Sequence, residues 1–167
     1  NIYKINVDDI KEILMSVKLK LMKHKKDTEC NIFAGTNQYP GAAVLSSMAA
    51  HKTGSGYVTL YYGYCDMEEN DTLLENVKTL IPEIIVKRNT DLEYLNIDSP
   101  MLIGPGGTSL SELELSKIAF HPSRTVIDAS AISCFDDNYS LSKKIYKIPN
   151  SSIMTPHVGE FKRFFEL

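Results

Sequence analysis

Four short segments of the sequence hold the residue types that bind ligands or handle protons, and each comes soon after a run of apolar residues. They are Gly35–Ala42, Gly104–Gly107, Asp128 and His157–Glu160. The first two are rich in glycine, which has no Cβ and lets a ligand approach the bare backbone. The other two bring carboxylates and an imidazole. Together they predict a site that combines backbone donors with a few polar side chains.

The segment around Tyr39 predicts a helix start that attracts anions. Gly35 and Gly41 admit backbone angles that a Cβ forbids, while Pro40 pushes Tyr39 toward an extended conformation. The small residues from Ala42 to Ala50 then continue as a helix, whose first N–H groups have no partner within the helix. The alternative is an ordinary strand–helix–strand crossover in which the glycines only make tight turns.

A second glycine-rich turn, Gly104–Gly107, follows the apolar run 101–103 and precedes a helix expected over 110–119. It is not a Walker phosphate loop, because the GK[ST] ending is missing. Asp128 in turn follows the apolar run 125–127. Two roles remain open for it: a working carboxylate at a strand end, or the cap of the next helix.

The last segment places His157 and Glu160 three residues apart, between a strand expected over 152–154 and a final helix. That helix is expected to start with Phe161 and to carry Phe161, Phe164 and Phe165 on its inner side. A lone histidine is more often structural, but the position of His157 beside Glu160 at a strand end favours a contact with ligand. The expected role is hydrogen bonding and not proton transfer.

Strand, turn and helix alternate along the chain, which predicts an α/β fold: a mostly parallel sheet with helices on both faces. Further strands are expected over 31–34, 57–62 and from 82 to 86, and a short helix over 72–80. An N-terminal helix within 2–22 is expected to pack through the apolar residues Ile10, Ile13, Leu14, Val17 and Leu21. Ligands of open parallel sheets bind beyond the carboxyl ends of the strands, so we expect the four segments to converge on one site.

Composition excludes several classes of protein. The chain has 167 residues, 43% of them hydrophobic, which suits one domain with a sizeable core, and it has no run long enough to span a membrane. A net charge of −3 predicts binding neither to nucleic acid nor to an anionic membrane. With no signal peptide, a cytoplasmic protein is expected, although the chain opens on Asn1 and its true beginning is open.

The remaining polar clusters predict no metal centre. Cys30, Cys65 and Cys134 lie far apart without metal-ligand spacing, so reduced thiols are expected. The basic residues between 18 and 26 predict a solvated face, with phosphate contact as the lesser alternative. The acidic segment 66–71 predicts a surface loop or helix start and no metal site.

Four stretches taken together, AGTNQYPGAAVLSSMAAHKTGSGYVTL, IGPGG, VIDASAI and IMTPHVGEFKR, resemble the NAD(P)H-hydrate dehydratase family of the ribokinase superfamily in order and spacing. The resemblance covers essentially the whole chain. It implies a ribokinase-like fold and the repair of hydrated NADH or NADPH, the substrates NADHX and NADPHX. In that reaction a nucleotide phosphorylates the hydroxyl of the hydrate, the phosphate leaves, and the intact cofactor is restored.

The same resemblance implies roles for individual residues. Gly41 and Ala42 would face the damaged cofactor, Gly106 would approach it through its backbone, and the turn from His157 to Arg163 would hold it with polar groups. The expected substrate-binding set is therefore Tyr39, Gly41, Ala42, Gly104, Gly106, Asp128, His157, Glu160 and Arg163. The TPH form is similar to the ADP-using bacterial branch, which implies ADP as the phosphoryl donor, with ATP as the alternative, together with Mg²⁺.

The sequence also departs from the family pattern. Ala34 and Thr36 stand for the first glycine and the serine of a GGS loop, Gly107 for a leucine, and Ser130 for the second Asp or Gly of a DAD or DAG triplet. The last change argues against a second carboxylate near Asp128. The family pattern continues to a GTGD loop, whose glycines form an anion hole and whose aspartate is the expected base, and no GTGD occurs in these 167 residues.

We therefore expect residues 1–167 to be the N-terminal portion of one ribokinase-like domain, incomplete at its C-terminus and without the catalytic aspartate or the donor-nucleotide part. Alone it should be all but inactive, since phosphoryl transfer depends on positioning and charge stabilisation. A partner chain or further copies of the chain should cover the missing half. Two alternatives remain: a ribokinase-like kinase acting on a vitamin precursor or sugar, and a truncated, non-catalytic dinucleotide-binding chain.

Overall fold

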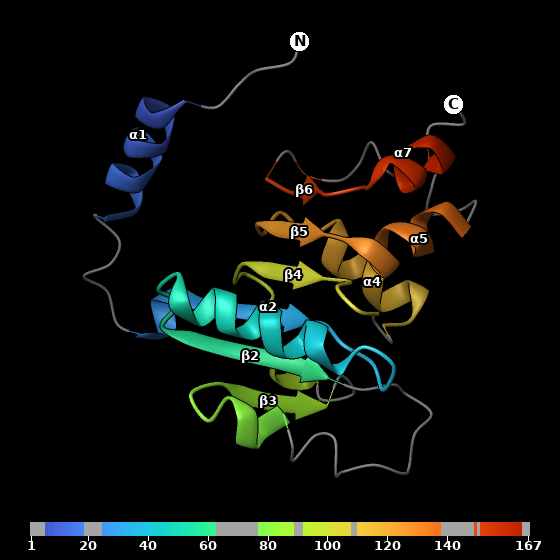
Figure 1. Ribbon diagram of the computed structural model, residues 1–167, viewed down its shortest axis with the longest axis horizontal. Coiled ribbons are helices and arrows are strands. Elements are labelled where there is room, and N and C mark those ends of the chain that lie inside the picture. Colours follow the sequence, from blue (N-terminus) through green and yellow to red (C-terminus); the bar gives the residue numbers. More distant parts are fainter. Residues whose placement is uncertain are drawn as a thin grey trace.

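A computed structural model describes residues 6–18, 25–62, 77–88, 92–107, 110–137, 149 and 151–164. Its centre is a six-stranded sheet in the order β3-β2-β1-β4-β5-β6 (Figure 1). Every neighbouring pair is parallel, as the sequence predicts. The strands are β1 (Glu29–Phe33), β2 (Tyr57–Tyr62), β3 (Ile85–Arg88), β4 (Met101–Ile103), β5 (Thr125–Ile127) and β6 (Ile153–Met154).

Alternating side chains of the strands build two cores, one on each face of the sheet. Ile32 and Leu60 belong to one core, while the adjacent Phe33 and Tyr61 belong to the other, as the period of a strand requires. The first core is covered by α2 (Pro40–Lys52) and the second by α4 (Glu112–Ala119) and α5 (Ala129–Asp137). The expectation of helices on both faces is thus confirmed.

Local sequence explains where these helices begin and end. Pro40 occupies the first turn of α2, where its missing N–H costs no hydrogen bond. The helix ends at Thr53, whose N–H donates to the Ala49 carbonyl over 3.0 Å. At α4, Ser111 and Glu114 form a capping box in which each side chain accepts the backbone N–H of the other residue.

The strand predictions are correct to within a few residues. β2, β4 and β5 match the expected ranges, whereas β1 starts two residues before the expected Asn31 because Glu29 already pairs with Tyr57. β3 begins at Ile85, later than the expected residue 82, which is a proline without an N–H to donate to the ladder. Of the helix expected over 72–80, residues 77–80 are helical. Its first residues, Cys65, the acidic segment 66–71 and the basic residues 19–24 lie outside the described part of the chain.

The remaining elements are α1 (Val7–Lys18), two short 3₁₀ turns, η1 (Lys25–Thr28) and η2 (Leu92–Tyr94), and α7 (Val158–Phe164). Asn6 starts α1, since its Oδ1 accepts the N–H groups of Asp8 and Asp9 at 2.8 and 3.0 Å. None of the described helices is long and apolar enough to cross a membrane.

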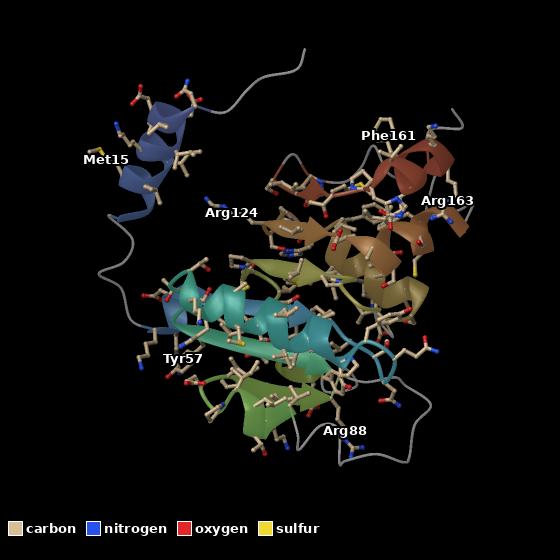
Figure 2. The ribbon with its side chains drawn as sticks, viewed as in Figure 1. Met15, Tyr57, Arg88, Arg124, Phe161 and Arg163 are labelled. Carbon is tan, nitrogen blue, oxygen red and sulfur yellow. The ribbon has the colours of Figure 1, made fainter. Side chains whose placement is uncertain are left out.

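The expectation that α1 is a packing helix is wrong for its described side chains, which do not include Val17 and Leu21. The helix forms, but it lies apart from the sheet (Figures 1 and 2), and Ile13, Leu14 and Met15 are 59%, 60% and 73% exposed. Amphipathic spacing therefore predicted the helix correctly, but not the exposure of its apolar face. None of its described apolar side chains belongs to either of the two cores.

One face of β4, β5 and β6, beside α2, also lacks a covering helix in the described part of the chain. A groove of about 700 Å³ runs along it. Leu102 and Val126 are half-buried there, and Leu45 and Ile153 are 69% and 60% exposed. We call this surface the open face; it is lined by Cys30, Ile32, Leu45, Ser46, Ala49, Ala50, Thr53, Pro100, Met101, Leu102, Arg124, Thr125, Val126, Ser151 and Ile153. Burial, with a smaller contribution from the Glu29 carboxylate, raises the pKa of the Cys30 thiol to about 11.

Shortening a buried side chain of β4 tests this packing. Ile103→Ala removes a fully buried side chain and should lower the free energy of unfolding by about 2–5 kcal/mol, because the core cannot close the cavity. Leu113→Ala, on the exposed side of α4, is the matched control and should change it by less than about 0.5 kcal/mol. Urea unfolding followed by circular dichroism measures both, and equal losses would contradict the assignment of the core.

Candidate functional site

The turns that follow β1, β4, β5 and β6 lie along one edge of the sheet and are joined by backbone hydrogen bonds. Because all strands are parallel, their carboxyl ends meet at this edge. The first residue after each of three strands donates its N–H to the last residue of the neighbouring strand. The bonds are Gly104 to Phe33 (2.9 Å), Asp128 to Ile103 (2.9 Å) and Thr155 to Ile127 (3.1 Å). The predicted convergence of separate turns therefore agrees with the structure.

Gly104 and Gly106 are needed for the close approach of these turns. Gly104 has a φ of 113°, and a Cβ there would overlap the Asp128 carbonyl oxygen. Gly106 has a φ of 70°, and a Cβ there would overlap the Ala42 Cβ. The first turn is tied to the same loop, since the Gly35 N–H donates to the Pro105 carbonyl over 2.8 Å. The packing of the turns thus requires glycine at both positions.

Gly41 differs from these two glycines. No atom lies within 4 Å of the position that a Cβ would take, so a side chain there would extend into open space. Its neighbour Tyr39 precedes α2, is 61% exposed, and makes no side-chain cap of the helix. The first turn of α2 therefore presents uncapped backbone donors beside an exposed aromatic ring.

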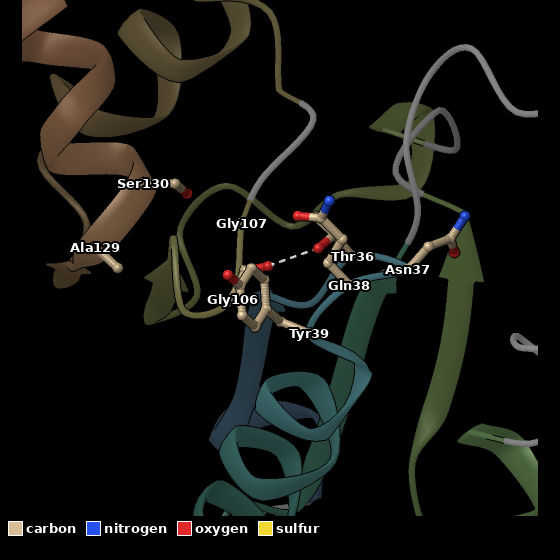
Figure 3. Close-up of a pocket in the computed structure, with 8 residues that line it drawn as sticks. All are labelled: Thr36, Asn37, Gln38, Tyr39, Gly106, Gly107, Ala129 and Ser130. Atoms are coloured by element: carbon tan, nitrogen blue, oxygen red, sulfur yellow. Dashed lines mark hydrogen bonds between the residues drawn. The ribbon is translucent and has the colours of Figure 1, made fainter.

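A hollow of about 690 Å³ opens between the turn after β1, the glycine loop after β4 and the start of α5 (Figure 3). It is lined by Thr36, Asn37, Gln38, Tyr39, Gly106, Gly107, Ala129 and Ser130. Of the predicted site residues, Tyr39 and Gly106 line it, while the others lie elsewhere along the same edge. Thr36, Asn37, Gln38 and Gly107 also lie within the predicted segments Gly35–Ala42 and Gly104–Gly107, although they are not in the expected substrate-binding set. Of the lining residues, Ala129 and Ser130 lie outside those segments.

Within the described residues Asp128 does not cap α5 with its side chain, while its role as a working carboxylate stays a prediction. Its Oδ1 accepts a hydrogen bond of 2.7 Å from the Thr155 hydroxyl, which ties the end of β5 to the end of β6. In the described part of the chain, no hydrogen bond joins this carboxylate to the backbone of α5. The next residue, Ala129, has a φ of 44°, which is strained for a residue with a Cβ. The carboxylate thus helps to hold the edge together.

His157 and Glu160 form a capping box at the start of α7. His157 Nδ1 accepts the Gly159 N–H over 3.0 Å and the Glu160 N–H over 3.4 Å, while Glu160 Oε2 accepts the His157 N–H over 2.8 Å. The His157 Nε2 lies 3.5 Å from Glu160 Oε1, and Glu160 is only 7% exposed. The structural role that the sequence left open for His157 is therefore present.

The capping box corrects two further expectations. It makes α7 begin at Val158, three residues before the predicted start at Phe161. Phe161 is 43% exposed, so its predicted position on the inner side is wrong. Figure 2 shows Phe161 and Arg163 on α7, at the opposite end of the sheet from Arg124. Arg163 is exposed there, and Phe165 lies outside the described residues.

Tyr62, the last residue of β2, contacts the turn that follows β1. Its hydroxyl donates to the Thr36 carbonyl over 3.5 Å, and burial raises the pKa of the phenol. A phenol with a raised pKa stays protonated and remains a donor to this carbonyl. The turn that lines the hollow is thus held by the sheet beneath it.

Comparisons with known proteins agree on one family. A family model described as NAD(P)H-hydrate dehydratase matches residues 30–167. A bifunctional NAD(P)H-hydrate repair enzyme of Corynebacterium glutamicum is 31% identical over 134 residues, which cover 79% of this chain and 21% of that protein. The enzyme of the same description from Thermosynechococcus vestitus is 26% identical over 145 residues, covering 80% and 26%.

Solved structures share the fold. A ribokinase-like superfamily protein of Enterococcus faecalis superposes with a TM-score of 0.65 at 25% identity, covering 87% of this chain and 51% of that one. The ADP/ATP-dependent NAD(P)H-hydrate dehydratase of Bacillus subtilis, co-crystallised with ATP/Mg²⁺, gives a TM-score of 0.62 at 21% identity and covers 87% and 50%. The chain thus spans about half of these structures and about a fifth to a quarter of the curated relatives.

The capping box can be tested by mutation. His157→Ala removes the acceptor for two N–H groups and should lower the free energy of unfolding by about 1 kcal/mol, whereas His157→Asn, another good cap, should restore most of it. His51→Ala, in the exposed last turn of α2, is the control and should have a smaller effect. Urea unfolding measures all three. If the alanine and asparagine variants at 157 were equally unstable, the capping role would be wrong.

Proposed function

The chain belongs to the NAD(P)H-hydrate dehydratase family, and from this premise we propose that it forms one wall of a binding site for hydrated NADH or NADPH. The proposal concerns binding by these residues first. The reaction, repair of the hydrate by nucleotide-driven dehydration, is proposed for the site as a whole. We place this reaction in the cytoplasm.

The observation that carries the proposal is the hollow at the carboxyl edge of the sheet. It combines exposed backbone of Gly106 and Gly107 with polar side chains of the turn before α2. The uncapped first turn of α2 suits an anionic group such as a pyrophosphate, and the exposed Tyr39 ring offers a flat apolar surface. A dinucleotide carries both kinds of group, so the chemistry of the edge matches the substrate class that the family implies.

We further propose ADP as the phosphoryl donor, with ATP as the alternative. When bound, the nucleotide supplies the phosphoryl group that turns the hydroxyl of the hydrate into a leaving group. We assign it no described residue, because the GTGD loop of the family pattern does not occur in these 167 residues. The described residues also include no group of three or more His, Cys, Asp or Glu that could hold a metal ion.

The residues of this chain are proposed to bind and orient the substrate, and not to move its protons. Asp128 is engaged by the Thr155 hydroxyl, and His157 and Glu160 are engaged with each other. None of these groups is a free base at the hollow. In the structure His157 caps a helix and is given no contact with the nucleotide. The proposal of ADP as the donor therefore rests on the TPH sequence form.

Gly41 provides the sharpest test of binding. Gly41→Leu places a bulky side chain in space that the protein leaves open, so the fold should remain intact while affinity for hydrated NADH falls by about tenfold or more. Gly41→Ala, whose added methyl meets no protein atom, is the graded control and should bind much like the unmodified chain. Isothermal titration calorimetry measures the affinity, and thermal unfolding confirms the fold.

Two outcomes would overturn the proposal. One is that the unmodified chain does not distinguish hydrated NADH from buffer; the other is that Gly41→Leu binds as well as Gly41→Ala. A protein that contains this chain and phosphorylates a sugar or vitamin precursor, without recovering NADH absorbance from the hydrate, would favour the kinase alternative.

We also propose that the open face is covered by the complementary half of an α/β domain, packed through an apolar helix. Two features support this proposal: Leu45 and Ile153 are largely exposed beside a groove of about 700 Å³, and the solved relatives are about twice as long as the region they share with this chain. In the absence of that half, copies of the chain are expected to cover the same surface, which the measurement of self-association below tests.

The open face leads us to expect self-association of the isolated chain. Because no described element covers its apolar groove, the chain should self-associate and bind the dye ANS, and Leu45→Glu combined with Ile153→Lys should reduce both. Leu113→Glu, an equally exposed leucine on the opposite layer, is the control. Sedimentation velocity reports the association. A monomer that binds no dye would contradict the proposal.

A further inference from the structure

Two hydroxyl groups hold the glycine loop that follows β4. The Thr36 hydroxyl donates to the Gly106 carbonyl over 3.0 Å, and the Ser130 hydroxyl donates to the Gly104 carbonyl over 3.0 Å. The two donors come from different elements, the turn after β1 and the first turn of α5. Figure 3 shows the loop between them, with Thr36 on one side and Ser130 on the other.

These bonds set the orientation of individual peptide groups. In the peptide group between Gly106 and Gly107, the Gly106 carbonyl accepts from the Thr36 hydroxyl. The Gly107 N–H of the same peptide group donates to the Gly104 carbonyl over 3.0 Å. That carbonyl is held in turn by Ser130. Both ends of this peptide are therefore fixed, and the backbone donor that precedes it, the Gly106 N–H, makes no hydrogen bond recorded within the described part of the chain.

External bonds matter here because the loop itself is weakly constrained. Gly104, Gly106 and Gly107 all have positive φ, and glycine loses more conformational freedom on ordering than any other residue. Each hydroxyl has one proton, which is already donated to a carbonyl. Thr36 and Ser130 line the hollow, yet as donors they are committed to the loop and not to a ligand.

We propose that Thr36 and Ser130 are positioning residues that brace the Gly104–Gly107 loop in the form that accepts the hydrated cofactor. The inference rests on the proposed function, and it names residues that act through the loop. Pre-ordering the loop lowers the entropic cost of binding, since fewer backbone conformations are lost when the ligand arrives. The same residues are two of the positions where this sequence departs from the family pattern.

The test compares hydroxyl deletions at the loop with matched deletions elsewhere. Thr36→Val and Ser130→Ala remove one hydrogen bond each and should weaken binding of hydrated NADH by about fivefold. Thr36→Ser keeps the hydroxyl and should restore the affinity. Thr53→Val and Ser151→Ala are the controls, because each removes a hydroxyl that donates to a backbone carbonyl, at 3.0 and 3.1 Å, away from the hollow.

Two measurements on the full chain decide the result. Calorimetry gives the dissociation constant for hydrated NADH, and amide hydrogen exchange by NMR reports the loop without ligand. We expect faster exchange at Gly107, whose N–H donates to the Gly104 carbonyl, in Thr36→Val and Ser130→Ala, with midpoints of thermal unfolding like those of the controls. Restoration by Thr36→Ser distinguishes bracing of the loop from general loss of stability.

Failure of the inference differs from failure of the proposed function. If the unmodified chain binds hydrated NADH and the two variants bind it equally well, the positioning role is wrong and the function stands. If the unmodified chain does not bind, the function is wrong and exchange alone decides: faster exchange at the loop supports bracing, and unchanged exchange overturns it.

Discussion

The close packing of backbone against backbone at the carboxyl edge of the sheet is the constraint on which the candidate site depends. Gly104 lies so near the Asp128 carbonyl, and Gly106 so near Ala42, that any side chain at either position would overlap its neighbour. A Cβ would therefore separate the turns after β1, β4 and β5, and the hollow would lose its shape. The glycines first allow the turns to meet, and a ligand can approach bare backbone as a result.

The parallel sheet makes that packing possible. Strand direction brings the four turns to one edge. The turns after β4, β5 and β6 each start with a hydrogen bond of 2.9–3.1 Å to the end of the neighbouring strand, and the turn after β1 bonds to the glycine loop. The two cores hold the strands in this arrangement by burying Ile32 and Leu60 on one side and Phe33 and Ile103 on the other. Stability of the sheet and geometry of the site are thus consequences of the same packing.

The polar side chains at this edge form hydrogen bonds that stabilise the protein itself. His157 and Glu160 cap α7, Asp128 accepts from Thr155, and Thr36 and Ser130 hold a glycine loop. A buried polar group needs a hydrogen-bond partner, so the polar residues between strands and helices satisfy one another first. The polar side chains at this edge are accordingly bonded to protein groups, while the Gly106 N–H of the glycine loop has no partner in the described part of the chain.

The sequence by itself determined the α/β class, the ranges of β2, β4 and β5, and the convergence of four turns, because alternating apolar periods and glycine-bearing turns are local signals and parallel strands share one edge. Tertiary structure alone decided which residues line the hollow and what each polar group binds. Thr36 meets Gly106 across 70 positions in the chain, and Asp128 meets Thr155 across 27. Such contacts depend on how loops pack in space, and α1 shows the same limit, since its apolar face predicted a helix but not what that face would contact.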